Sequence, residues 1–133
     1  MAHDRQQIED LAATYTEAWC SQDAARVAAH YAPGGMIAIN GGEPAAIAEV
    51  AAGFISAFPD IEVVMDDLVF KGGDVVEYRW TFTGTSAETG KWVRIPGFEE
   101  WRIGADGLIA ESRGQYDQAE YDRQLREGAR PTG

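Results

Sequence analysis

Two side chains, Glu99 and Tyr15, have the chemistry of a site for a carbonyl compound. Alternation along residues 97–103 puts Glu99 on the same strand face as Trp101 and Ile103, where an ionised carboxylate is costly. We therefore expect its pKa to be raised, so that a protonated Glu99 donates a hydrogen bond. Tyr15 lies on the apolar face of an expected helix and brings a phenol toward the same interior. Two such donors at one point would hold a ketone oxygen and stabilise an enolate.

The same pair also has a purely structural interpretation. Buried polar groups are usually hydrogen-bonded, so Glu99 and Tyr15 could instead bond to each other or to the backbone. A third role is open to Glu99, since a raised pKa suits a base as well as an acid. The sequence leaves all three interpretations standing.

The elements before residue 60 that must position this pair follow a helical apolar period. Asp4 and Gln7 resemble a capping box for a first helix that contains Tyr15. A second helix is expected over 24–31, because the segment Pro33-Gly34-Gly35 follows it. A third is expected from Pro44, as a first-turn proline, to Phe58.

After residue 60 the apolar period changes to two, which is typical of strands. Four strands are expected, at 61–70, 75–84, 91–103 and 108–116. Their tight connections predict an antiparallel meander, followed by a last helix over 118–126 and a frayed tail over 127–133. The fold class is therefore α+β, with helices over a strongly curved antiparallel sheet, in one domain spanning 1–133.

The expected inner surface is richer in aromatic residues than a simple core needs, and small residues interrupt it. The candidate ligand-binding residues are Trp19, Ile39, Phe54, Tyr78, Trp80, Trp101, Ser112, Gly114 and Tyr116. Space between such walls suits a small apolar ligand. The alternative is that these aromatic side chains only fill the core. The other sheet face carries a Glu/Arg ladder, which is either solvated or the interface of a homodimer.

Composition limits the partners and cofactors that we expect. With 11 basic and 22 acidic residues, the net charge of -11 repels nucleic acid and anionic membranes. The polar start and the lack of a run of roughly 20 apolar residues predict a cytoplasmic protein. One cysteine and two histidines, without a metal-binding pattern, predict no metal site and no cofactor.

The chain resembles the cone-shaped fold of nuclear transport factor 2. The similarity is greatest to its SnoaL-like polyketide cyclase and ketosteroid isomerase branches. The segments that carry the resemblance are 15–32 (YTEAWCSQDAARVAAHYA), 58–61 (FPDI), 75–85 (VVEYRWTFTGT) and 97–117 (GFEEWRIGADGLIAESRGQYD). Their order and spacing cover nearly the whole chain. The resemblance implies a cone-shaped α+β barrel that encloses a pocket.

The resemblance also assigns roles to single positions. Tyr15 and Glu99 match the oxyanion-hole tyrosine and aspartic acid of the isomerases. The isomerases' general base falls on Ile39, and the acid/base aspartate of the cyclases falls on Gly114, while Glu99 falls where the cyclases carry a histidine. Neither Ile39 nor Gly114 takes a proton, so this chain departs from both relatives where they move protons.

Three functions follow as alternatives. The first is an enzyme that acts on a polycyclic, steroid- or polyketide-like ketone by isomerisation, cyclisation or another proton transfer. The second is a non-catalytic protein that binds an apolar molecule. The third is a scaffold for dimerisation whose pocket is filled by its own side chains.

Overall fold

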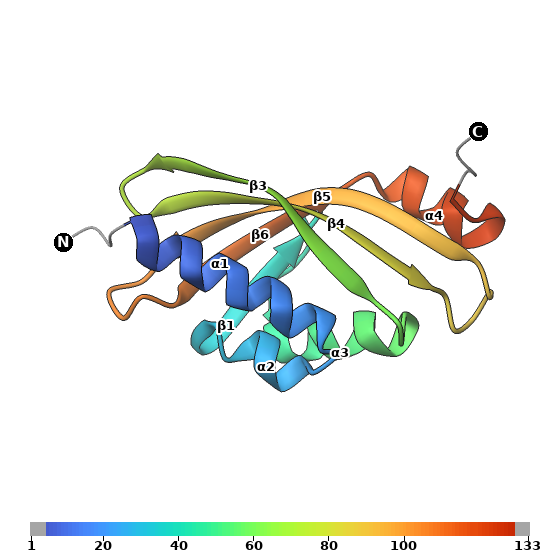
Figure 1. Cartoon of the computed structure of the whole chain (residues 1–133), viewed down its shortest axis with the longest axis horizontal. Coiled ribbons are helices and arrows are strands. Elements are labelled where there is room, and N and C mark those ends of the chain that lie inside the picture. The colour runs from blue at the N-terminus through green and yellow to red at the C-terminus, as the bar shows by residue number, and fades with distance from the viewer. Residues whose placement is uncertain (1–4, 130–133) are drawn as a thin grey trace.

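The computed structural model describes residues 5–129, in which one curved sheet of six strands is flanked by helices. The elements in chain order are α1 (Arg5–Cys20), α2 (Ala24–Ala28), β1 (Tyr31–Ile39), β2 (Ala45–Ala46), α3 (Ile47–Ala57), β3 (Glu62–Gly72), β4 (Val75–Thr85), β5 (Trp92–Ile103), β6 (Ile109–Tyr116) and α4 (Gln118–Glu127). The strand order is β2-β1-β6-β5-β4-β3. Helices α1, α2 and α3 lie on one side of the sheet (Figure 1). The predicted α+β class and curved sheet are confirmed.

Strands β3 to β6 form the antiparallel meander that the two-residue period predicts. Gly72 and Gly73 connect β3 to β4 with φ angles of 104° and 58°, which side chains rarely adopt. Strand β1 returns beside β6 and runs parallel to it. The core lies between the concave face of this sheet and the apolar sides of α1 and α3.

The prediction of a helix over 24–31 is wrong at its end, because α2 stops at Ala28 and Tyr31 begins β1. Tyr31 is buried and pairs with Ile109. The register then shifts before Met36, and Gly34, with φ of 74°, lies within this irregular stretch. The glycines that we expected to end a helix therefore form a bulge inside a strand.

The start of α3 and the end of α4 also differ from the predictions. Helix α3 begins at Ile47 and not at Pro44, because residues 45–46 pair with β1 as the short strand β2. Helix α4 begins as predicted but ends one residue later, at Glu127, which was assigned to the frayed tail; it is capped by Asp117, whose side chain accepts from the amide of Glu120. Position 4 of the predicted capping box and positions 130–133 of the predicted frayed tail lie outside the described residues.

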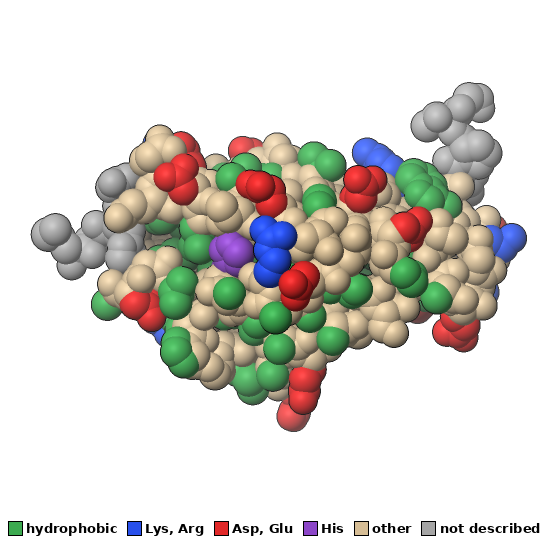
Figure 2. Space-filling model, turned by 60° about the horizontal axis from the view of Figure 1, so that its bottom comes forward, with side chains coloured by type: hydrophobic (Ala, Val, Ile, Leu, Met, Phe, Trp, Pro, Cys, Tyr) green, Lys and Arg blue, Asp and Glu red, His purple; other side chains and the backbone are tan. Residues whose placement is uncertain are grey.

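The convex face of the sheet carries the expected charged ladder. Glu77 accepts from Arg79 at 2.6 Å and from Lys71 at 3.2 Å, and Arg102 pairs with Glu111 at 2.8 Å. The homodimer through this face stays a prediction. On the helix side, acidic side chains are spread across the surface and basic ones are few (Figure 2). Between residues 5 and 129, no helix combines the length and apolar character that crossing a membrane requires.

Candidate functional site

Glu99 lies at the middle of β5, on the concave face of the sheet. Its neighbours in register are Tyr78 on β4 and Gly114 on β6. The side chain is only 6% exposed. The strand alternation that places Glu99 inside also places Trp101 inside, so the predicted burial of this carboxyl group is present in the structure.

One oxygen of Glu99, Oε1, accepts all of the hydrogen bonds that this side chain makes. The donors come from α1, β1, β5 and β6: Tyr15 Oη at 2.9 Å, Trp101 Nε1 at 3.0 Å, Tyr31 Oη at 3.4 Å and Ser112 Oγ at 3.4 Å. The other oxygen, Oε2, accepts no hydrogen bond from residues 5–129. The carboxyl group is thus fixed through one oxygen and leaves the other without a partner.

The pKa of Glu99 is raised because burial disfavours its charged form. Bonds from Trp101, Tyr15, Ser112 and Tyr31 lower the pKa and offset part of that shift. Burial, and then the nearby charge of Glu99, raises the pKa of Tyr15 well above its ordinary value, so the phenol stays protonated and donates. With Oε1 occupied by donors, the proton of neutral Glu99 belongs on Oε2.

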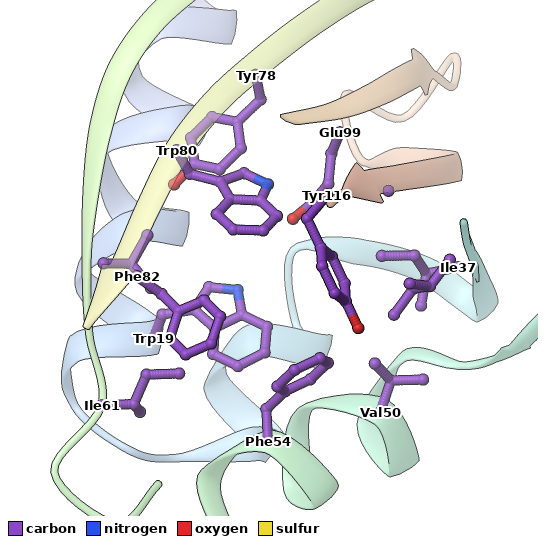
Figure 3. A pocket seen from close by; sticks show the side chains of 13 residues that line it. Trp19, Ile37, Val50, Phe54, Ile61, Tyr78, Trp80, Phe82, Glu99 and Tyr116 are labelled. Carbon is purple, nitrogen blue, oxygen red and sulfur yellow. The ribbon is translucent and has the colours of Figure 1, made fainter. Parts of the chain in front are cut away.

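Glu99 forms part of the wall of a cavity between the concave sheet face and the helices (Figure 3). The thirteen lining residues are Trp19, Ile37, Ile39, Val50, Phe54, Ile61, Val63, Tyr78, Trp80, Phe82, Glu99, Gly114 and Tyr116. Glu99 is the one carboxyl group among them. A carboxyl oxygen without a partner therefore faces a space whose other walls are almost entirely apolar.

The cavity is small. About 50 Å³ of it can be reached by the centre of a water molecule. Treated as a sphere and extended by a water radius of ~1.4 Å, this space takes an occupant of about 200 Å³. An occupant of one or two rings fits these walls, whereas a four-ring steroid would require aromatic side chains to move.

Trp80 supplies a second polar atom to the same wall. Its Nε1 is buried and has no hydrogen-bond partner among the described residues. Leaving such a donor unpaired costs about 1–3 kcal/mol. In Figure 3 the indole nitrogen lies on the side of the ring that faces the Glu99 carboxyl group. The wall residues therefore carry one carboxyl oxygen and one fully buried indole N–H without partners.

The structure brings most of the predicted site residues together but divides them between two groups. Seven predicted ligand-binding residues line the cavity: Trp19, Ile39, Phe54, Tyr78, Trp80, Gly114 and Tyr116. Trp101 and Ser112 bond Glu99 Oε1 instead and are not among the lining residues, and the same is true of Tyr15. Tyr15 thus bonds Glu99, as the structural interpretation allowed. The phenol of Tyr15 and the carboxyl group of Glu99 therefore do not both donate to a ligand.

Sequence reasoning missed Tyr31 as a donor, because the residue was assigned to a helix. It also missed several apolar wall residues, namely Ile37, Val50, Ile61, Val63 and Phe82. For Phe82 the signal was present, since the residue shares the strand face of Tyr78 and Trp80.

The positions that hold proton-moving groups in the resembled families form an apolar wall here. Ile39 and Gly114 are direct neighbours in the parallel pairing of β1 and β6. Nearby polar residues are engaged elsewhere: Asn40 accepts from the Tyr116 amide at 2.9 Å, and Asp66 accepts from Thr81 at 2.6 Å. Among the lining residues, Glu99 is accordingly the one carboxyl group available for acid–base chemistry. Over residues 5–129, no cluster of three potential metal ligands occurs.

The sequence model of the SnoaL-like domain matches residues 12–112. The chain belongs to the SnoaL-like family. None of the curated proteins is similar enough in sequence to match it.

Solved structures agree with this assignment at the level of the fold. A protein from Jannaschia sp. CCS1, described as a SnoaL-like polyketide cyclase, is 19% identical, with 98% of this chain and 100% of that chain covered and a TM-score of 0.75. A protein with a ketosteroid isomerase-like fold from Catenulispora acidiphila is 14% identical, with coverage of 84% and 88% and a TM-score of 0.74. A nuclear transport factor 2-like protein from Exiguobacterium sp. 255-15 is 23% identical, with coverage of 81% and 98% and a TM-score of 0.69.

The unequal donors on Oε1 lead to a prediction for the pKa of Glu99. Replacing Tyr15 by Phe removes the bond of 2.9 Å and is expected to raise this pKa further, because the carboxylate loses a donor that stabilises it. Tyr31→Phe removes a bond of 3.4 Å and is expected to have a smaller effect in the same direction. The Glu99 side-chain carbon shift, followed by NMR against pH, measures both. A larger shift for Tyr31→Phe would contradict this ranking.

Proposed function

We propose that this protein is an enzyme of the cyclase or isomerase type that moves a proton next to a carbonyl group, with Glu99 as its acid–base residue. The observation that carries the proposal is the free Oε2 of Glu99 at the wall of an apolar cavity, with Oε1 held by four donors. A carboxyl group fixed in this way has one oxygen positioned for proton transfer. Family membership supports a polyketide cyclase-type reaction.

The reaction is a proton transfer at carbon. The carboxylate Oε2 takes a proton from the carbon beside the carbonyl, and the electrons of the C–H bond form an enolate. Oε2 then returns the proton to another carbon, which completes an isomerisation. Alternatively, the enolate carbon attacks a second carbonyl of the same molecule and closes a ring, and Oε2 gives its proton to the new alkoxide. Apolar walls favour both routes, because water would compete for the enolate's proton.

Proton exchange tests the proposal without knowledge of the natural substrate. 2-Tetralone, a two-ring ketone with acidic protons beside its carbonyl, is incubated with the protein in heavy water, and NMR follows the loss of those protons. We expect catalysis of about 10²-fold or more over buffer, typical of a positioned general base. The rate should rise with pH as Glu99 loses its proton, with a midpoint above the ordinary glutamate pKa of about 4.3.

Non-catalytic binding is the second candidate, and the wall formed by Ile39 and Gly114 favours it, since the resembled enzymes carry proton-moving groups there. Binding alone predicts that 2-tetralone saturates the protein, seen as quenching of its tryptophans, without exchange above the buffer rate. That result would remove the catalytic proposal and leave a binding protein.

A further inference from the structure

We infer that Trp80 Nε1 is the hydrogen-bond donor that holds the carbonyl oxygen of the substrate, while Glu99 Oε2 faces the carbon beside it. The inference rests on the proposed function and deepens it by naming the substrate class, a ketone of one or two rings. Trp80 is thereby a catalytic residue and not only part of an aromatic wall.

The first observation is the unpaired donor. Nearly all buried polar groups have a partner, and the indole nitrogen of Trp80 is the one fully buried side-chain nitrogen without a partner in the described part of the chain. The Tyr78 hydroxyl on the same walls is engaged: it lies 2.5 Å from Thr16 Oγ1, which itself donates to Ala12 O at 2.8 Å. The Tyr116 hydroxyl also belongs to a wall residue, but Tyr116 is only half-buried, so water can satisfy it. Trp80 thus stands apart as a donor that a ligand can satisfy.

The second observation is how the indole is held. Trp80 lies opposite Gly97 in the pairing of β4 with β5, and its six-membered ring packs onto that glycine. A Cβ at position 97 would lie 2.6 Å from both Cζ2 and Cη2 of Trp80 and 2.6 Å from the carbonyl oxygen of Gln115. Any side chain at this position would therefore displace the ring. The glycine leaves room for the ring against β5, two residues from Glu99 along the strand.

The third observation is the relation of the two polar atoms. Gly97 and Glu99 project from the same face of β5, so Trp80 and Glu99 are diagonal neighbours on the concave face. Both line the same cavity, and the indole nitrogen is turned toward the carboxyl group (Figure 3). A ketone oxygen and the adjacent C–H group are likewise neighbours. A ketone can therefore place its oxygen on Nε1–H and its acidic carbon at Oε2.

The assignment also explains how an enolate is stabilised here. Charge moves to the carbonyl oxygen when Oε2 removes the proton, and a fixed donor in an apolar cavity stabilises that charge strongly. Tyr15, the donor expected from the sequence, is already bonded to Glu99. Trp80 takes the role at the cavity wall that Tyr15 was expected to fill.

The test compares 2-tetralone with tetralin, the hydrocarbon of the same ring skeleton, in wild type and in Trp80→Phe. Ligand-observed NMR measures affinity, and exchange in heavy water measures catalysis. Trp80→Phe is expected to weaken 2-tetralone binding by about fivefold and to leave tetralin binding unchanged within about twofold, because one hydrogen bond is lost and an aromatic wall is kept. The exchange rate should fall by about 10²-fold. Trp92→Phe, at an exposed position on β5, is the matched control and should change neither quantity.

Wild-type protein supplies an independent readout if Trp80→Phe does not fold. The chain has four tryptophans, so a spectrum of nitrogen-15-labelled protein has four indole signals. We expect 2-tetralone, and not tetralin, to move one of these signals downfield. Equal responses to the two compounds, including no response to either, would overturn the inference.

The results also separate this inference from the proposed function. If Glu99→Gln abolishes exchange and Trp80→Phe leaves both exchange and ketone preference intact, Trp80 has no such role, while the acid–base role of Glu99 stands. If wild type shows ketone preference that Trp80→Phe removes, but no exchange, Trp80 holds the oxygen of a bound ligand and the catalytic proposal fails.

Discussion

Replacing Glu99 by Gln is expected to lower the protein-catalysed exchange of 2-tetralone by about 10²–10⁴-fold, the usual contribution of a general acid or base. Glutamine has the same shape, and its amide oxygen can accept from Tyr15 and Trp101 as Oε1 does. Its amide nitrogen would occupy the place of Oε2 and cannot take a proton from carbon. The substitution therefore removes the chemistry while keeping the packing, so affinity for the ketone should change little.

Glu100→Gln is the matched control for this prediction. Glu100 follows Glu99 directly but projects from the convex face, opposite Glu77 and Arg113 in the sheet register. The control substitution removes a carboxyl group from the same strand without touching the cavity. Equal losses of exchange in the two variants would show that charge on the sheet, and not the carboxyl group in the cavity, governs the rate.

The raised pKa of Glu99 also has a consequence for stability. A carboxyl group whose pKa is higher in the folded state contributes stability that is present below its unfolded pKa and is lost as pH rises through the folded pKa. A glutamine side chain does not titrate, so Glu99→Gln should gain stability relative to wild type over that same rise in pH. Urea unfolding of both proteins at a series of pH values measures the difference. A variant that loses exchange yet gains stability cannot owe its lost activity to unfolding.

The sequence predicts the sheet better than the segment between the first helix and the third. Burial alternates along β5, and the residues of β4 and β6 that were predicted to face the interior are buried or half-buried in the structure. The segment from Ala24 to Ala46 contains glycines and alanines that suit several conformations. In this segment, the pairing of β1 with β6 and of β2 with β1 determines the secondary structure, and local propensity does not.

The candidate site was predicted in its residue types but not in its hydrogen bonds. Alternation and helical spacing place Glu99, Tyr15 and Trp80 in one interior. Which donor meets Glu99 depends on distances of a few tenths of an ångström between elements far apart in sequence, such as the 2.9 Å bond from α1 to β5. The unpaired nitrogen of Trp80 could not be predicted from the sequence for the same reason, since a missing partner is a property of the packed structure.

Replacing Trp101 by Ala is expected to lower the free energy of unfolding by about 3–5 kcal/mol, the range for removing a large buried aromatic side chain. Trp101 is fully buried, stacks on Tyr78 with ring centroids 4.7 Å apart, and packs edge-on against Tyr15 at 5.2 Å. It also donates to Glu99, so the carboxyl group loses a partner as the cavity enlarges. Urea unfolding monitored by circular dichroism measures the change.

Trp92→Ala provides the comparison, because Trp92 lies on the same strand with its side chain 49% exposed. We expect a change within about 1 kcal/mol there, as for most exposed positions. A domain of this kind has about 5–15 kcal/mol of stability in total, so the loss expected for Trp101→Ala is a large share of it. If both variants lost the same stability, Trp101 would not anchor the core, and the carboxyl group would be held in place by Tyr15, Tyr31 and Ser112 without it. The Trp101 indole contributes both to the core and to the hydrogen bonds that hold Glu99, which links the architecture of the sheet to its proposed chemistry.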